Sequence, residues 1–173
     1  MKQKIDYLIE KLKDETAENA FQFSDELAEI ETPYVLNELI FLLKESRSQE
    51  VKYLVARTLS LLEENEDALI PLLEEINKKE NVENSGGLTA ALEGFDCSQK
   101  FVEIFKLYLF GSYKTQAMAK LILDDTEFEI TARTVRKAEK HWKHYCNNTK
   151  QDEVFALKKV EIEEMLHELK ALF

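Results

Sequence analysis

The sequence predicts an all-α protein of about ten helices, paired as antiparallel hairpins. Its 173 residues include only 4 glycines and 2 prolines, too few for a sandwich or barrel with a turn every 8 to 12 residues or so. Apolar residues recur at helical spacing along almost the whole chain. The polar segments between these stretches are short, so we expect consecutive helices to lie antiparallel as neighbours.

Four helices are expected before residue 65, over apolar stretches from Ile5 to Leu12, Ala20 to Ile30, Pro33 to Leu43 and Val51 to Leu62. Thr32 is placed to cap the third of these, and Pro33 fits its first turn. Ser46-Arg47-Ser48 separates the third helix from the fourth.

Six more helices are expected over Glu66 to Lys78, Ser85 to Phe95, Ser98 to Phe110, Ser112 to Leu123, Thr131 to Cys146 and Asp152 to Leu172. Pro71 falls inside the first of them, where it must kink the helix or delay its start. Asn147-Asn148-Thr149 ends the fifth of them.

Apolar positions repeat at a spacing of 33 residues. The step separates Leu59 from Leu92, and Leu36 from Leu69, and it shortens to 29 between Leu92 and Leu121. Beyond about residue 125 no repeat is found. A repeated helical pair exposes an apolar face that only its neighbours can cover, so the ends of such an array need modified, capping units.

The segment Val51-Lys52-Tyr53-Leu54-Val55-Ala56-Arg57-Thr58-Leu59 resembles the second helix of a HEAT repeat, which reads roughly Val-Arg-x-x-Ala-Ala-x-Ala-Leu. Asp67 to Leu73 is similar to the proline-bearing first helix of that family, and Lys114, Ala117 and Leu121 continue the pattern. The resemblance implies a single domain, residues 1–173, forming an α-α superhelix. It has N-terminal cap helices at 1–31, HEAT-like repeats at 32–125 and C-terminal cap helices at 126–173.

Charge is unevenly distributed along the chain. The net charge is −11, and residues 1–100 carry 22 acidic and 11 basic side chains, whereas residues 101–173 are neutral overall. Such a field repels nucleic acid and anionic membranes and accelerates the approach of a basic protein, although solubility alone also explains it. No apolar run resembles a signal peptide or a membrane span, so we expect a cytoplasmic protein with Cys97 and Cys146 reduced.

No motif for catalysis or for a cofactor is found. His141 and His144 share a helix face but are too few to hold a metal, and we expect Trp142 and Tyr145 beside them to pack the C-terminal cap. Gly86-Gly87 indicates a close-packed helix start rather than a phosphate loop. The chain is therefore not expected to be an enzyme, nor to bind a metal or a cofactor.

The helix at 131–146 carries a basic stripe of Arg133, Arg136, Lys137, Lys140 and Lys143. Glutamates on the last helix are close in sequence, and we expect them to pair with it: Glu161, Glu163, Glu164 and Glu168. Phosphate binding is the alternative.

We expect partner-binding residues in the acidic stretch Glu63-Glu64-Asn65-Glu66-Asp67, which joins two helical units. Tyr53, Arg57 and Glu93 lie opposite the apolar stripe of second helices, which line the concave face of HEAT-like proteins. The seven candidate residues are thus Tyr53, Arg57, Glu63, Glu64, Glu66, Asp67 and Glu93.

A non-catalytic protein-binding module is the function these features favour, because solenoids offer extended surfaces to another chain. Small acidic helical-repeat proteins of this size are similar to bacterial immunity proteins, which cover a toxin with complementary charge. The expected partner is a basic, nuclease-type toxin domain, bound by a chain that is monomeric when free. A HEAT-like adaptor for another cytosolic protein is the alternative, and a nucleic-acid-binding or DNA glycosylase relative is less favoured.

Overall fold

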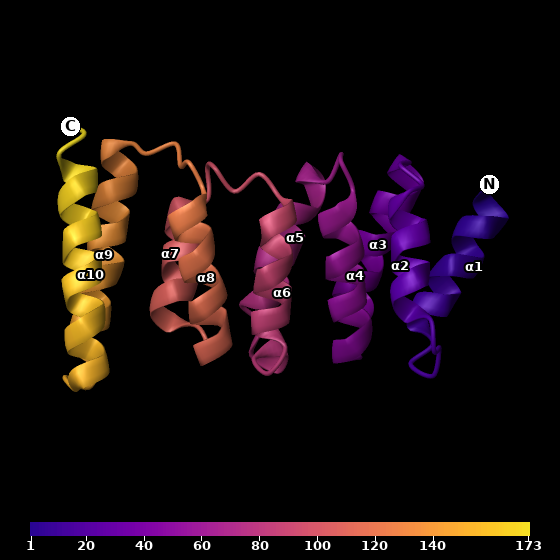
Figure 1. Ribbon diagram of the computed structural model, residues 1–173, viewed down its shortest axis with the longest axis horizontal. Helices are drawn as coiled ribbons and strands as arrows, with labels where there is room; N and C mark the ends of the chain where they lie inside the picture. Colours follow the sequence, from indigo (N-terminus) through magenta and orange to yellow (C-terminus); the bar gives the residue numbers. More distant parts are fainter.

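A computed structural model of the chain consists of ten α-helices, two short 3-10 helices and no strand (Figure 1). The predicted all-α class and the number of helices are both confirmed. The elements are α1 (Lys2–Lys13), α2 (Ala20–Ala28), α3 (Pro33–Glu45), α4 (Gln49–Leu61), α5 (Glu66–Ile76), η1 (Lys79–Asn81), α6 (Ser85–Ala91), η2 (Leu92–Gly94), α7 (Phe101–Phe110), α8 (Tyr113–Asp125), α9 (Ala132–Asn148) and α10 (Glu153–Lys170).

The helices form two layers. Helices α2, α4, α6 and α8 contact one another in succession, while α3 contacts α5 and α7 contacts α9 in the second layer. The helical pairs follow one another along the long axis of the molecule, with the two termini at opposite ends (Figure 1). One apolar core of 38 buried residues runs through the stack from Ile5 in α1 to Leu166 in α10.

Several helices begin at a Ser, Thr or Asp residue whose side chain caps the first turn. The Thr32 hydroxyl accepts a hydrogen bond from the Val35 amide, with Pro33 in the first turn as predicted. The same geometry starts α4 at Ser48, α8 at Ser112, α9 at Thr131 and α10 at Asp152. Each cap satisfies an amide that the helix itself leaves unpaired.

The helix boundaries differ from expectation in the middle of the chain. Helix α6 ends at Ala91 and continues as the 3-10 turn η2, and α7 begins at Phe101, three residues later than predicted. The delay has a local cause, because the Asp96 carboxylate accepts a hydrogen bond from the Ser98 amide and holds a turn there. Helix α5 begins at Glu66, so Pro71 lies within the helix and does not delay its start.

Candidate protein-binding surface

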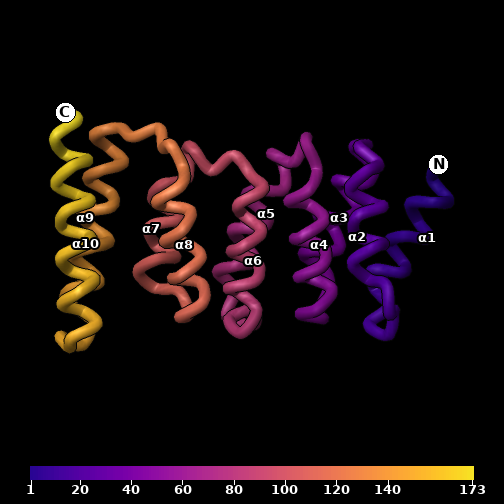
Figure 2. Tube along the Cα trace, viewed as in Figure 1, coloured from indigo at the N-terminus to yellow at the C-terminus, as the bar shows by residue number.

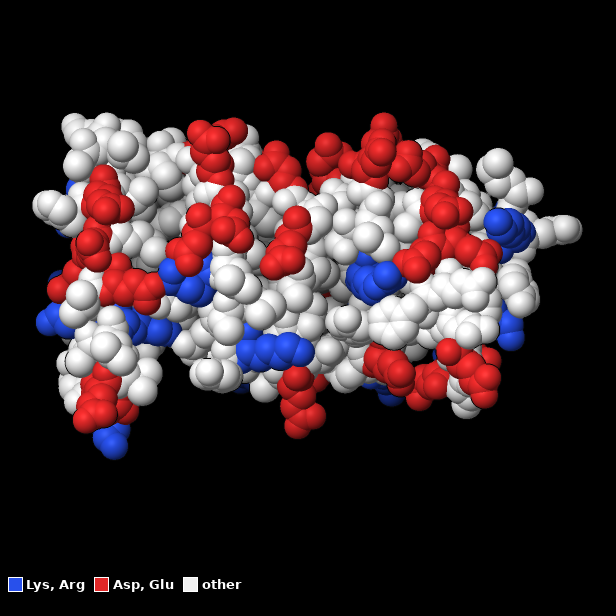
Figure 3. Space-filling model, in the orientation of Figure 1, with Lys and Arg blue, Asp and Glu red and all other residues white.

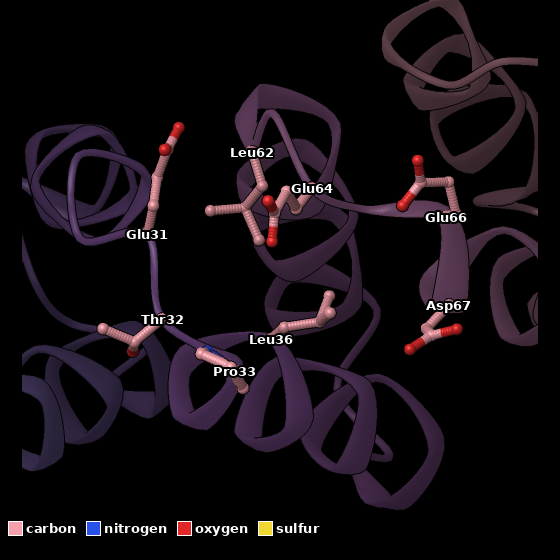
Figure 4. A pocket seen from close by; sticks show the side chains of 8 residues that line it. All are labelled: Glu31, Thr32, Pro33, Leu36, Leu62, Glu64, Glu66 and Asp67. Atoms are coloured by element: carbon pink, nitrogen blue, oxygen red, sulfur yellow. The ribbon is translucent and has the colours of Figure 1, made fainter.

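A cleft of about 180 Å³ lies between the α2–α3 loop and the start of α5. Four carboxylates line it, together with Thr32 and an apolar floor of Pro33, Leu36 and Leu62 (Figure 4). The carboxylates are those of Glu31, Glu64, Glu66 and Asp67. The acidic stretch predicted from the sequence therefore faces a second segment, around Glu31, which is about 33 residues earlier in the chain and was not among the predicted site residues.

Asn65 holds this acidic loop in place. Its side chain is buried, and its Nδ2 donates hydrogen bonds to the Leu59 carbonyl at 3.0 Å and to the Gly94 carbonyl at 2.9 Å. The loop is therefore tied to α4 on one side and to η2 on the other, and Glu64 and Glu66, which flank Asn65, start from a fixed backbone. Glu66 and Asp67 also lie in the first turn of α5, where the helix dipole favours negative charge.

None of the four cleft carboxylates is neutralised within the chain. The ion pairs of the structure involve other residues throughout. Figure 4 shows Glu31 on one side of the cleft and Glu66 and Asp67 on the other, and a cation from another molecule that enters the cleft relieves the repulsion among these carboxylates. The cleft is thus suited to receive a positively charged side chain.

The cleft belongs to a longer acidic edge of the molecule. The loops that follow α2, α4, α6 and α8 all lie at the same edge, the upper one in Figure 2. Acidic side chains line that edge in Figure 3, from above α2 to α8. These loops, together with the two helical residues on either side of each, contain two basic residues, Lys100 and Arg133, and twelve acidic ones: Glu29, Glu31, Glu63, Glu64, Glu66, Asp67, Glu93, Asp96, Asp124, Asp125, Glu127 and Glu129.

Tyr53 and Arg57 lie on the outward face of α4, away from the cleft. The Arg57 guanidinium forms an ion pair with Asp25 at 2.7 Å, donates to the Ser24 hydroxyl at 2.6 Å and lies 5.2 Å from the centre of the Phe21 ring. The Phe21 ring meets the Tyr53 ring edge to face at 6.4 Å. The two predicted residues thus form one cluster with α2 residues that sequence reasoning did not include.

Glu63 and Glu93 are exposed but do not line the cleft. Glu93 instead borders a separate recess of about 330 Å³ between η2 and α8, with Phe95 and Leu121. The seven candidate residues are therefore distributed over the cleft, the acidic edge and the outward face of α4.

Gly86 and Gly87 at the start of α6 are buried. A Cβ on Gly86 would meet the stem of Lys114, and one on Gly87 would lie 3.0 Å from the Tyr53 ring. The pair is thus covered by side chains from α8 and α4, and the close-packed helix start is confirmed.

The aromatic residues of α9 pack against α10, so the expected packing role of Trp142 and Tyr145 is confirmed. Trp142 is buried and stacks on Tyr145 at 5.6 Å and on Phe155 of α10 at 6.0 Å. Burial lowers the pKa of His141, and the nearby cations Lys106 and Lys140 lower it further. No group of three or more His, Cys, Asp or Glu side chains is arranged to hold a metal ion.

The expected pairing of the basic stripe with the last helix is wrong. No ion pair joins any of its five cations to a glutamate of α10, and the one ion pair between these helices runs the other way, from Lys170 to Glu139. Glu161 instead pairs with Lys120 of α8 at 2.8 Å, because α10 packs that face against the body of the molecule. The cations on α9 are all exposed: Arg133, Arg136, Lys137, Lys140 and Lys143.

Both cysteines are unpaired, Cys97 buried and Cys146 half-buried. Burial raises the pKa of the Cys97 thiol to about 11, and the neighbouring Asp96 carboxylate adds to the shift. This thiol is therefore protonated at neutral pH.

Comparisons with protein-family models, with curated proteins and with solved structures give no match to this chain. No helix combines the length and the apolar character that crossing a membrane requires.

Proposed function

We propose that the chain is a non-catalytic protein-binding module that receives a basic surface of another protein at the acidic cleft and edge. Its most concrete form is an immunity protein that neutralises a basic, nuclease-type toxin. The observation that supports the proposal is the cleft itself, in which four carboxylates without internal partners surround an apolar floor. The proposal retains the HEAT-like superhelix as the architecture that presents this surface.

The cleft chemistry fits an arginine or lysine side chain. The aliphatic stem of such a residue packs on Leu36 and Leu62, while its charged end lies among the carboxylates. The rest of the acidic edge acts at longer range, where complementary charge raises the association rate more than the final affinity.

Affinity capture from lysate and secreted fraction tests the proposal with two variants of equal net charge. The cleft variant carries Glu31→Gln, Glu64→Gln, Glu66→Gln and Asp67→Asn. The control variant carries Glu15→Gln, Glu18→Gln, Glu45→Gln and Glu80→Gln, exposed positions near the opposite ends of the helices. A basic protein should be retained by the wild type and the control and lost from the cleft variant. Equal retention by both variants would refute the cleft as the binding site.

The immunity form is tested by growth. The captured basic protein should arrest bacterial growth when expressed alone, and co-expression with the wild-type chain should restore growth. The cleft variant should fail to restore it. A captured protein that is harmless when expressed alone would favour the adaptor function instead.

A second candidate function follows from the exposed cations of α9. These side chains lie at the end of the molecule opposite the acidic N-terminal part, and no internal carboxylate neutralises them. Phosphate binding along this helix predicts retention on DNA that falls steeply with salt. Replacing Arg133, Lys137 and Lys140 with glutamine should then abolish retention, while absence of retention by the wild type excludes this candidate.

A further inference from the structure

Two aromatic side chains lie side by side on the outward face of the α2–α4 layer. Phe21 of α2 is 54% exposed and Tyr53 of α4 is 36% exposed, and their rings are in edge-to-face contact. Figure 3 shows an uncharged surface over the middle of these helices, bordered by basic atoms and by acidic side chains above and below it. Phenylalanine is usually buried, so an exposed aromatic pair of this kind is typical of a surface that another molecule covers.

Phe21 lies beside the contact that packs α2 on α4. Ser24, one turn later on the same side of α2, is fully buried, and its hydroxyl receives hydrogen bonds from Arg57 at 2.6 Å and from the Thr58 hydroxyl at 2.9 Å. Arg57 also lies 5.2 Å from the centre of the Phe21 ring, which places the half-exposed ring at the rim of this contact. The position of Phe21 is thus fixed by the packing of α2 on α4.

Arg57 makes the pair rigid. Its guanidinium lies against the Phe21 ring and is held by Asp25, so its charge is already neutralised within the chain. A pre-ordered cluster of Phe, Tyr and Arg loses little conformational entropy on binding, which is the usual composition of an energetic centre in an interface.

The unpaired charged residues of this region are acidic. Glu50 lies in the first turn of α4, one turn before Tyr53, and Glu29 and Glu64 follow the C-terminal ends of α2 and α4. With Arg57 paired to Asp25, no unpaired cation of these two helices faces the partner. Charge complementarity therefore selects a basic occupant.

We infer that Phe21 and Tyr53 form the apolar anchor of the partner-binding surface, occupied by a protein segment rich in arginine or lysine and carrying aliphatic side chains. The aliphatic groups pack on the two rings, and a cation of the segment lies over the outer face of Tyr53. This anchor rests on the proposed function and deepens it. The aromatic pair supplies short-range apolar contact, while the acidic cleft and edge attract the partner at longer range. It acts at short range and is insensitive to salt, unlike the edge.

The anchor is tested with two synthetic probes, a labelled 12-residue peptide of alternating Arg and Leu and its partner of alternating Arg and Ser. Dissociation constants are measured by fluorescence anisotropy at physiological salt and at 1 M NaCl. The Arg-Leu peptide should bind the wild type about tenfold more tightly than the Arg-Ser peptide, and the difference should persist at high salt.

The variant Phe21→Ser/Tyr53→Ser should lose that difference. Phe41→Ser is the matched control, because Phe41 is 64% exposed on α3, in the other layer, and its loss should leave both affinities unchanged. Phe21→Ser alone serves as a second variant, since Tyr53 also packs on Gly87 and its replacement affects α6. Thermal melts of each variant confirm that it is folded.

The anchor is refuted if both peptides bind the wild type equally, if neither binds at about 1 mM, or if Phe21→Ser and Phe41→Ser weaken binding to the same extent. The cleft variant described above separates this result from the proposed function. If that variant captures partners as the wild type does while the aromatic variant does not, the cleft is wrong and the anchor stands. If only the cleft variant loses partners, the reverse holds.

Discussion

Gly94 is a glycine for reasons of space rather than of backbone conformation. No glycine in the chain has a positive φ, but a Cβ on Gly94 would overlap the backbone carbonyl oxygen of Ser60. We predict that Gly94→Ala destabilises the fold by about 2 to 3 kcal/mol, because backbone cannot move aside as a side chain can. The measurement is the free energy of urea unfolding.

Gly87→Ala is the control for this prediction. The Cβ added there would lie 3.0 Å from the Tyr53 ring and 3.2 Å from the Asn84 side-chain oxygen, so its neighbours need to move by only a few tenths of an ångström. Its effect should be clearly smaller than that of Gly94→Ala, and equal effects would show that the approach of η2 to α4 is not the limiting contact.

Glu75 is a buried carboxylate in a fully paired network. Lys52 donates to it at 2.6 Å, Lys78 at 2.5 Å and Asn81 at 2.9 Å. Burial by itself would raise the pKa of Glu75, but these three hydrogen bonds outweigh burial and lower it below the ordinary 4.5. We predict that Glu75→Gln costs about 3 kcal/mol at pH 7, because it leaves the Lys52 ammonium buried without a counter-charge.

The lowered pKa of Glu75 also predicts how the stability of the protein changes with pH. A carboxylate whose folded pKa is lowered stabilises the protein fully above its ordinary pKa, and this stabilisation is lost as the pH falls through the folded value. The wild type should therefore lose more stability than Glu75→Gln when the pH falls below 4.5. The double variant Lys52→Met/Glu75→Leu should be more stable than Glu75→Gln, and the opposite order would contradict the account.

Individual surface residues were only partly predictable. Glu64, Glu66 and Asp67 stand in a run of acids that any reading of the sequence notices, but Glu31 joins them through the packing of α3 on α5, which local periodicity does not specify. Phe21 fits an apolar helical stripe, yet it is exposed beside Tyr53 of α4, and the residue that α2 buries against α4 is Ser24. Both omissions depend on contacts between residues about 30 positions apart.

At the scale of the element, α10 is joined to the body of the molecule by a buried lysine. The Lys158 ammonium donates to the Tyr108 carbonyl at 2.9 Å and to the Gln116 side chain at 2.5 Å, and it lies 4.3 Å from the centre of the Tyr108 ring. The Tyr108 carbonyl is in the last turn of α7, where the helix offers it no partner. Lys158 thus caps α7 from a different helix and brings a positive charge to its negative end.

We predict that Lys158→Met loosens α10 selectively, at a cost of about 1 to 3 kcal/mol, because the buried Tyr108 carbonyl and the partly buried Gln116 side-chain oxygen lose their donor. Amide hydrogen exchange should accelerate in α10 and remain unchanged in α3 to α6. Lys159→Met is the control, since Lys159 is half-exposed and its one ion pair, with Glu163 at 3.9 Å, is long. A uniform acceleration along the chain would show that Lys158 supports the whole fold rather than one element.

Helix starts were predictable where a capping residue precedes an apolar stripe, as at Thr32, Ser48 and Ser112. The pairing of charged faces was not. The glutamates of α10 were expected to meet α9, but helical spacing only places Glu161 on a face and does not say which neighbour that face meets. Buried cross-helix contacts such as that of Lys158 orient α10, and they have no local signature.

For the whole molecule, the two edges differ in charge. The edge that contains the cleft is acidic almost throughout, whereas the segments at the other edge mix both signs: Lys13 to Asn19, Lys44 to Ser48, Asn77 to Asn84, Gly111 to Lys114 and Thr149 to Asp152. Helix dipoles explain part of this distribution, because the acidic edge also holds the N-termini of α3, α5, α7 and α9. They do not explain Glu31 and Glu64, which lie outside the helices.

Acidic residues in a first helical turn and acidic residues outside the helices should therefore respond differently when they are neutralised: the first change should lower the free energy of unfolding and the second should raise it. Glu31→Gln and Glu64→Gln should each raise the free energy of unfolding by a few tenths of a kcal/mol at low salt, because they relieve repulsion in the cleft. Glu66→Gln should lower it by about 0.3 to 1 kcal/mol, since Glu66 lies in the first turn of α5. Both effects should fade at 1 M NaCl, where the Debye length is about 3 Å.

Two results together would show that folding and function oppose each other at Glu31 and Glu64: a gain of stability when either is neutralised, and loss of the partner by the cleft variant. The repulsion between these carboxylates would then be relieved when the partner binds. Urea unfolding of the single variants at low and high salt, set beside the capture experiment, measures both sides. A loss of stability on neutralising Glu31 or Glu64 would assign these carboxylates a structural role instead. The acidic edge would then be an ordinary feature of the fold, and the aromatic anchor on α2 and α4 would have to account for partner binding by itself.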